Sequence, residues 1–77
     1  MKNEVSQCPM CGLKPILIRT NGLFLCDCPT NCKFQTDVYN LFKDDDSKEW
    51  LFSVSNDKFS AIQIWNSQVT CFEEYRK

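Results

Sequence analysis

The chain has 77 residues, six of them cysteine, and a single domain is the most that this length supports. A chain this short buries little apolar surface and commonly relies on disulfides or a bound metal for stability. Nine Lys and Arg against ten Asp and Glu give a formal charge of −1, with no histidine. This composition argues against nucleic-acid binding by bulk charge, and it excludes histidine-based catalysis and histidine-containing metal sites.

The first seven residues are polar and lead directly into Cys8. They contain neither an apolar core nor a small-residue cleavage site, so we expect no secretory signal and a cytoplasmic protein. No apolar run approaches the roughly 20 residues of a membrane span. In a reducing compartment, six cysteines indicate metal binding more often than disulfides.

Two separated cysteine clusters can supply the four ligands of a tetrahedral zinc site. The first is the knuckle sequence Cys8-Pro9-Met10-Cys11-Gly12, whose spacing lets both sulfurs point at one ion while Gly12 permits the backbone to turn. The second cluster occupies residues 26–32 and holds three cysteines. The alternative for the first pair is a redox dithiol, which requires a helix start in a βαβ pattern, whereas a strand pattern follows here.

A β-hairpin is predicted between the two clusters. Residues 15–19 and 23–26 are rich in β-branched and aromatic side chains and flank Asn21-Gly22, the strongest short-range signal for a type I′ turn. With these two residues as the turn, Thr20 lies opposite Leu23. This register brings both cysteine clusters to the same end of the hairpin, with Cys11 opposite Cys32.

The same register bears on which cysteines of the second cluster bind the metal. Cys28 falls opposite Pro15, close to the knuckle, whereas Cys26 falls about 7 Å further along the strand. We therefore predict a structural Zn²⁺ held by Cys8, Cys11, Cys28 and Cys32, with Cys26 as a small buried strand residue. Cys26 in place of Cys28 stays open as the alternative. Cys71 is interpreted as an apolar packing residue.

The rest of the chain predicts two further strands and a helix. Residues 33–39 alternate enough for a third strand, residues 43–48 form a charged connection, and residues 49–54 suggest another strand. The three carboxylates at 44–46 lack the spacing of a calcium loop and are interpreted as a solvated turn. From about Asp57, apolar residues at steps of three or four predict an amphipathic helix that packs on the hairpin: Phe59, Ile62, Trp65, Val69 and Phe72.

The fold class expected from these elements is a small α+β metal-bound domain. It has a zinc-ribbon or zinc-knuckle β-hairpin, one or two further strands and a C-terminal helix packed on the sheet. Residues 1–77 form one zinc-ribbon-like domain.

The order of these motifs resembles the restriction alleviation protein family (Lar-like), which are small zinc-finger proteins of phages and prophages. The resemblance rests on the knuckle at residues 8–12, the hairpin, the second cysteine pair and the helix motif A-x-x-x-W-N, matched by Ala61, Trp65 and Asn66. It implies an anti-restriction role in the host bacterial cytoplasm: the protection of phage DNA from a type I restriction–modification system.

The sequence allows three classes of function to be compared: an enzyme, a protein-interaction module and a nucleic-acid-binding protein. Four thiolates without histidine favour a closed structural site, so we expect no enzyme and no small-molecule substrate. Our leading hypothesis is a protein-interaction module that binds a host defence enzyme, with no membrane partner. The second is a nucleic-acid-binding zinc ribbon that uses Lys14, Arg19 and Lys33 with Phe24 as a stacking group. Four thiolates and one Zn²⁺ would take the charge from −1 to about −3, which disfavours phosphate binding.

Overall fold

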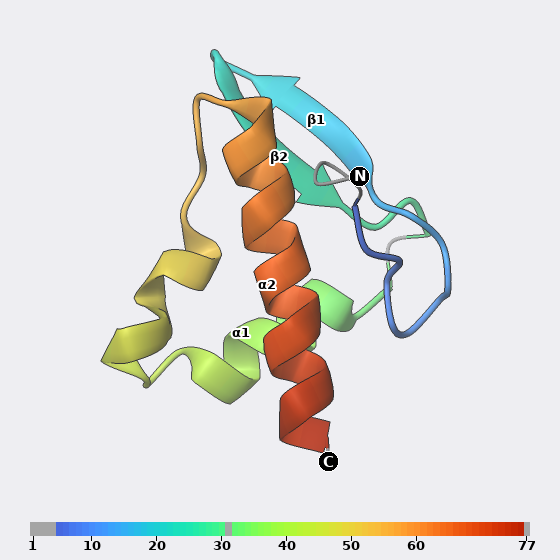
Figure 1. Cartoon of the computed structure of the whole chain (residues 1–77), viewed down its shortest axis with the longest axis vertical. Helices are drawn as coiled ribbons and strands as arrows, with labels where there is room; N and C mark the ends of the chain where they lie inside the picture. Colours follow the sequence, from blue (N-terminus) through green and yellow to red (C-terminus); the bar gives the residue numbers. More distant parts are fainter. Residues whose placement is uncertain (1–4, 31, 77) are drawn as a thin grey trace.

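The computed structural model describes residues 5–30 and 32–76. Residues 1–4, which belong to the N-terminal segment predicted to contain no secretory signal, lie outside the described residues. The chain forms a small α+β fold (Figure 1). Its elements are β1 (Ile16–Thr20), β2 (Leu23–Asp27), α1 (Phe34–Phe42), a 3₁₀ helix η1 (Asp46–Phe52) and α2 (Lys58–Arg76). Within the described residues, no helix is long and apolar enough to cross a membrane.

The predicted hairpin is confirmed in position and register. β1 and β2 pair antiparallel, with Thr20 opposite Leu23 and Ile16 opposite Asp27. Asn21 and Gly22 have φ values of 54° and 78°, which are the left-handed conformations that a type I′ turn requires at both central positions. The turn sequence therefore fixes the strand register, and the register fixes where the second cysteine cluster begins.

The predicted third strand at residues 33–39 is wrong, because this segment forms α1. Phe34 and Val38 are fully buried one helical turn apart, and the partly buried Leu41 and Phe42 continue the same stripe at the next turn. A spacing of four places Phe34 and Val38 on one side of a strand as well as of a helix, so this short pattern does not distinguish the two conformations. Tertiary burial against α2 decides between the two.

The predicted strand at residues 49–54 is also wrong, since most of it belongs to η1. Asp45 caps this helix by accepting hydrogen bonds from the N–H and the hydroxyl of Ser47, at 3.0 and 2.6 Å. The backbone is extended again at Ser53, and Ser55 forms an isolated bridge to Phe24 of β2. The sheet of the described residues thus has two strands, and helices occupy the places of the two further predicted strands.

The predicted C-terminal helix is confirmed, and its start is fixed by a cap. Asp57 accepts a hydrogen bond from the backbone N–H of Ser60 at 3.1 Å, as an N-cap residue does. The buried face of α2 consists of Ala61, Trp65, Gln68, Val69 and Phe72. Phe59, predicted to pack on the hairpin, is instead 45 % exposed, because it lies on the opposite side of the first turn.

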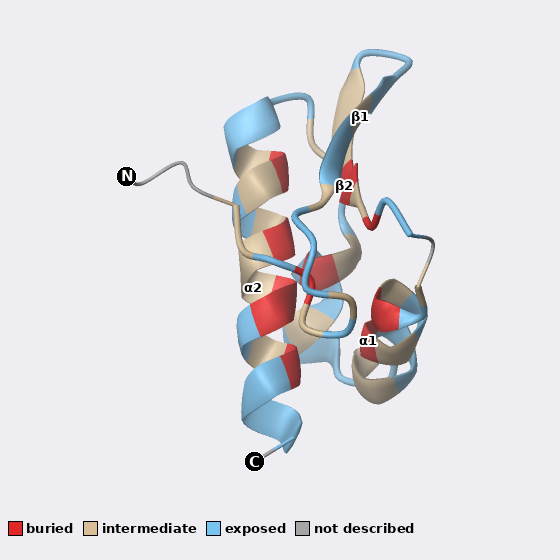
Figure 2. Ribbon diagram, turned by 90° about the vertical axis from the view of Figure 1, so that its right-hand side faces the viewer, coloured by how far each residue is buried: buried red, intermediate tan, exposed pale blue. Residues whose placement is uncertain are grey.

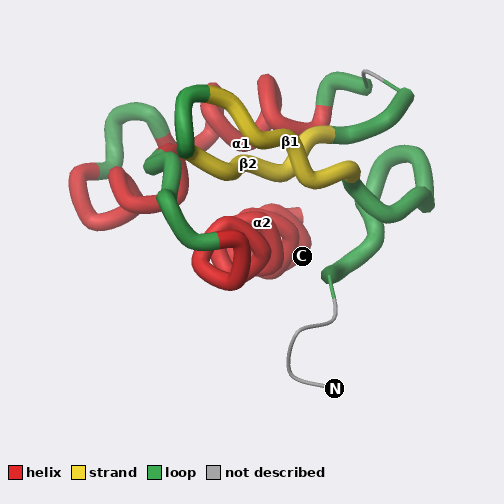
Figure 3. The backbone as a smooth tube through the Cα atoms, turned by 90° about the horizontal axis from the view of Figure 1, so that it is seen from above, coloured by secondary structure: helices red, strands yellow, loops and turns green. Residues whose placement is uncertain are grey.

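The core lies where α2 meets β2 and α1. Figure 2 shows the buried residues along one side of α2, turned toward the hairpin and α1. Figure 3, in which α2 is seen end-on, shows this helix on one face of the hairpin. The Phe34 ring packs edge-on against the rings of Trp65 and Phe72, with centroids 5.1 and 5.2 Å apart. Cys8 and Cys28 belong to the same buried cluster, so the cysteine site is continuous with the core.

Candidate metal centre

The structure brings together the sulfurs of Cys8, Cys11, Cys28 and Cys32, all within 4.8 Å of one another. In a tetrahedral site with metal–sulfur bonds of about 2.3 Å, neighbouring sulfurs lie about 3.8 Å apart. The observed spacing therefore fits one metal ion at the centre of the four sulfurs. Four sulfur ligands complete a tetrahedral shell and leave no position for a water or a substrate.

The four sulfurs form one shared cluster and not two separate pairs. The Cys28 sulfur lies 3.1 Å from that of Cys11 and 3.2 Å from that of Cys32, while the Cys8 sulfur lies 3.4 Å from that of Cys32. All six cysteines of the chain are free thiols. A sulfur with two close sulfur neighbours fits a common ligand site better than a pairwise disulfide arrangement.

The first two ligands are positioned by the knuckle turn. The N–H of Gly12 donates to the carbonyl of Cys8, and the N–H of Cys8 donates to the carbonyl of Leu13, both at 2.8 Å. Gly12 has a φ of 76°, so the prediction that this position needs glycine's conformational freedom is confirmed. The two hydrogen bonds close the loop around the sulfurs of Cys8 and Cys11.

The second pair of ligands follows β2 directly. Asp27 ends the strand, and its side chain accepts a hydrogen bond from the N–H of Cys28 at 2.9 Å. The hydroxyl of Thr30 lies 3.1 Å from the Cys28 sulfur, a contact that the sequence reasoning missed. Cys32 stands two residues before the start of α1, so the site links the hairpin to the helix.

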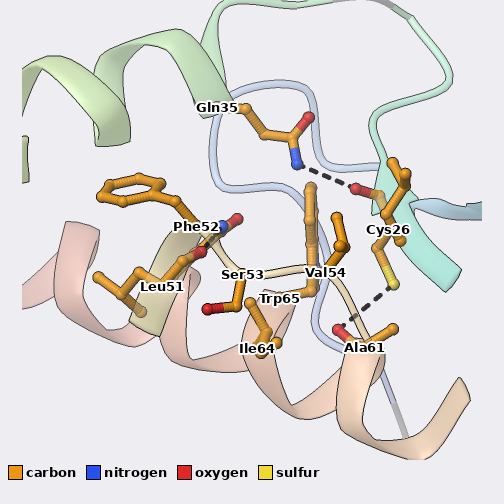
Figure 4. A pocket seen from close by; sticks show the side chains of 11 residues that line it. Cys26, Gln35, Leu51, Phe52, Ser53, Val54, Ala61, Ile64 and Trp65 are labelled. Atoms are coloured by element: carbon orange, nitrogen blue, oxygen red, sulfur yellow. Dashed lines mark hydrogen bonds between the residues drawn. The ribbon is translucent and has the colours of Figure 1, made fainter. Parts of the chain in front are cut away.

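The structure places Cys28 in the cluster and Cys26 outside it. The Cys26 thiol is buried and points to the carbonyl of Ala61 on α2, at 3.8 Å, and the Cys26 carbonyl accepts from the Gln35 side chain at 2.9 Å (Figure 4). Burial raises the pKa of Cys26 above its ordinary value of 9.0. The residue therefore packs as a neutral thiol between the sheet and α2.

The segment entering the knuckle is held by the helix motif Trp65-Asn66. The indole N–H of Trp65 donates to the carbonyl of Ser6 at 2.8 Å, and the side-chain oxygen of Asn66 accepts from the N–H of Ser6 at 2.7 Å. Both backbone groups of Ser6 are thus satisfied by adjacent residues of α2. Because Ser6 precedes Cys8 by two residues, this clamp fixes the chain where it enters the site.

The thiols of the cluster differ in pKa: those of Cys8 and Cys32 are raised, and that of Cys28 is lowered. Burial raises the pKa of Cys8 to about 12, and the N–H groups of Cys11 and Met10, which favour its thiolate, offset this only in part. Burial also raises the pKa of Cys28, but hydrogen bonds from Thr30, Cys11 and Cys32 outweigh it and bring the pKa to about 6. Burial likewise raises the pKa of Cys32. The hydrogen bonds to Cys28 therefore favour its thiolate form near neutral pH.

A separate cavity of about 210 Å³ lies between β2, η1 and α2 (Figure 4). None of its described lining residues carries a charge. Gln68 lines it and donates to the carbonyl of Leu51, but the Gln68 side-chain oxygen is shielded from solvent and has no hydrogen-bond partner among the described residues. We find no group of nucleophile and base at this cavity among the described residues.

The residues proposed for nucleic-acid stacking are arranged differently from the expectation. The guanidinium of Arg19 lies over the ring of Phe24, 5.8 Å from its centroid, so one face of this ring is covered. Lys14, Arg19 and Lys33 are exposed, and none forms an ion pair with a described residue.

Comparisons with protein-family models, with curated proteins and with solved structures give no match to this chain.

Proposed function

We propose that the four-cysteine centre binds Zn²⁺ and that the ion has a structural role. Four sulfurs in tetrahedral spacing are the donor set that zinc commonly takes in structural sites. The cluster is part of the buried core and joins the knuckle, the end of β2 and the start of α1. An ion there would tie three segments together while leaving no coordination position for chemistry.

We further propose that the protein is an interaction module that counters or modulates a host defence system, as the resemblance to restriction alleviation proteins implies. The observation that carries the interaction role is a set of exposed apolar side chains in the knuckle and at the start of β1. Met10, Leu13, Ile16 and Leu17 are 42–49 % exposed, although each is a large hydrophobic side chain. Exposed apolar side chains concentrated in one segment of so small a protein favour a contact with another macromolecule. The expected partner is a host protein such as a restriction–modification enzyme.

Nucleic-acid binding is the second candidate function, and fewer features of the structure support it. The Phe24 ring is already occupied on one face by Arg19, and base stacking needs an open aromatic face. The zinc-loaded cluster would also add negative charge near Lys14. A salt-dependent gel shift with duplex and single-stranded DNA separates the two candidates, and nanomolar DNA binding would favour the second.

Two matched variants test the metal centre. Purified protein is expected to contain one zinc per chain, which Cys28→Ser should lose and Cys26→Ser should keep, because only the Cys28 sulfur lies in the cluster. Zinc content by atomic absorption gives the result. Equal zinc loss in both variants, or no zinc in the wild type, contradicts the assignment.

A cellular assay tests the proposed role in defence. Bacteria that carry a type I restriction system and express the protein should accept unmodified phage with higher plating efficiency than cells without it. A Cys8→Ser variant serves as the control, because it removes a ligand and leaves the surface apolar residues in place. Unchanged plating by the wild type, together with no binding to the purified restriction enzyme, would rule out this role.

A further inference from the structure

The outer edge of β1 is the free edge of the sheet, and the hairpin geometry shows which backbone groups it presents. A two-residue turn makes Thr20 and Leu23 a hydrogen-bonded pair, so pairs alternate from there along the ladder. The pairs Arg19–Phe24 and Leu17–Cys26 are then the non-bonded ones, whose N–H and C=O groups point outward. On β1 these outward groups belong to Leu17 and Arg19.

The corresponding outward groups of β2 are covered. The N–H and C=O of Phe24 both bond to the backbone of Ser55, at 2.6 and 3.4 Å, and the carbonyl of Cys26 accepts from the Gln35 side chain. These contacts are made by the residues of β2 that belong to non-bonded pairs, so they agree with the alternation of bonded and non-bonded pairs derived from the turn. No described residue bonds to the outward groups of Leu17 or Arg19.

The edge of β1 carries few of the features that discourage pairing with another chain. Natural edge strands use inward-pointing charges, bulges or prolines for this purpose, and on this edge Pro15 stands just before the strand while Arg19 is its one charged side chain. Here Ile16 and Leu17, which point to opposite faces of the strand, are 49 % and 42 % exposed, and Met10 and Leu13 add exposed apolar surface at its beginning. An added strand would therefore meet an apolar side chain on either face.

Arg19, near the turn end of β1, indicates the chemistry of the partner. It is the one charged side chain of β1, Lys14 precedes the strand, and Asp27, the one carboxylate of β2, lies opposite Ile16 at the other end of the hairpin. Neither cation forms an ion pair with a described residue, although Arg19 stacks on Phe24. Arg19 shares a strand face with Leu17, so a carboxylate on an added strand can approach its guanidinium.

We propose that β1 binds an extended segment of another protein, apolar and carrying carboxylates, which pairs with the backbone of Leu17 and Arg19 as a third strand. The inference deepens the proposed function and rests on it, since it assigns the surface by which the interaction module holds its partner. Backbone pairing would provide the affinity, and the side chains at Ile16, Leu17 and Arg19 would select the sequence.

Amide hydrogen exchange, measured by NMR on the zinc-loaded full chain, tests the pairing directly. The probe is a peptide of four isoleucine–glutamate repeats, and the matched control replaces glutamate by lysine. At saturation, the acidic peptide should slow exchange at Leu17 and Arg19 about tenfold or more, while Ile18 and Thr20, already bonded to β2, stay unchanged. It should also bind about tenfold more tightly than the lysine peptide.

Two variants separate the backbone contribution from the side chain. Leu17→Pro removes an outward N–H, which an edge strand tolerates, and should abolish peptide binding while zinc content stays at one per chain. Leu17→Thr keeps the N–H and should bind the acidic peptide more weakly than the wild type but still protect Arg19. If Leu17→Pro fails to fold, the exchange data on the wild type decide alone.

Three results would overturn the proposal. They are the absence of protection at Leu17 and Arg19 with either peptide, equal binding of both peptides, and protection that arises without peptide as the mass doubles with protein concentration. The last would identify a second copy of this chain as the occupant.

The phage assay separates this proposal from the proposed function. A Leu17→Pro variant that holds zinc and raises phage plating as well as the wild type would reject β1 as the binding edge, while the defence role stands. Peptide binding without any effect on plating would reject the defence role alone.

Discussion

At the scale of single residues, the Trp65-Asn66 pair has a clear mechanical role. Trp65 is 1 % exposed, and its ring fills the core beside Phe34 while its N–H reaches the carbonyl of Ser6. Asn66 satisfies the other backbone group of Ser6. One turn of α2 thus couples the packing of the core to the entry of the knuckle, and a motif first noted for its family resemblance acquires a physical function.

Removal of the Trp65 N–H should weaken the metal site at a distance. In Trp65→Phe the ring volume is largely kept but the hydrogen bond to Ser6 is lost, which should destabilise the fold by about 1–3 kcal/mol and lower zinc affinity in competition with a chromophoric chelator. Trp50→Phe is the matched control, since Trp50 is 47 % exposed and donates only to the nearby Ser47 carbonyl. Equal effects of the two variants would contradict the clamp.

The thiol pKa values predict how zinc binding depends on pH. Zinc displaces a proton from each ligand that is still protonated, and above about pH 6 Cys28 has already lost its own. We expect fewer than four protons to be released per zinc at neutral pH, measured by calorimetry in buffers of different ionisation enthalpy. Affinity should fall as the pH decreases, and more steeply below about 6, where Cys28 is protonated as well. Release of four protons at neutral pH would show that Cys28 is not a preformed thiolate.

At the scale of the elements, the hairpin turn depends on two positive φ angles. A Cβ at Gly22 would meet no atom within 4 Å, so Gly22→Ala tests the backbone conformation alone. With φ at 78°, the substitution should lower the free energy of unfolding by about 1–2 kcal/mol, measured by urea denaturation. Asn21→Gly, which relieves the other positive φ, should cost little. A neutral Gly22→Ala would mean that the turn adopts another form.

The elements that differ from their predictions share a cause. Residues 33–39 and 49–54 are short and apolar, and such segments are compatible with a strand as well as a helix. α1 buries Phe34 and Val38 completely, and η1 buries Leu51 completely, all against α2 or its neighbours. The longest periodic segment, α2, was the one whose helical character could be predicted, because 19 residues repeat the pattern often enough to distinguish the period.

At the scale of the whole molecule, the metal centre and the core are one unit. Cys8 and Cys28 belong to the buried cluster that contains Phe34, Trp65 and Phe72. A structural zinc site contributes an apparent 10–16 kcal/mol, a range of about the size of the whole stability of an ordinary domain. Loss of the ion should therefore disturb more than the knuckle.

Chelation is expected to destabilise the entire fold. In the presence of excess EDTA and a reductant, the urea midpoint should fall sharply, and the near-ultraviolet signal of Trp65 should weaken as α1 and the knuckle separate from α2. Added zinc should restore both. Identical unfolding curves with and without the chelator would contradict a structural role for the site.

The hairpin, its register, the final helix and the grouping of four cysteines could be predicted from the sequence. Each of these follows from local chemistry: an Asn21-Gly22 turn, the knuckle turn at Gly12, and a helical period that runs from Ala61 to Phe72. The register also favoured Cys28 over Cys26 as a metal ligand. Two residues along a strand span about 7 Å, which is too far for a ligand to the same ion.

The conformation of the middle of the chain and the identity of its free surfaces depend on long-range packing. Whether residues 33–54 form strands or helices depends on burial against α2, which no local window contains. Exposure depends equally on distant neighbours: Ser55 and Gln35 cover the outer edge of β2, and no described residue covers β1. The local sequence pattern limits the backbone conformations that each segment can adopt. Long-range packing selects among these conformations, because the burial of a side chain depends on residues that are distant in the sequence.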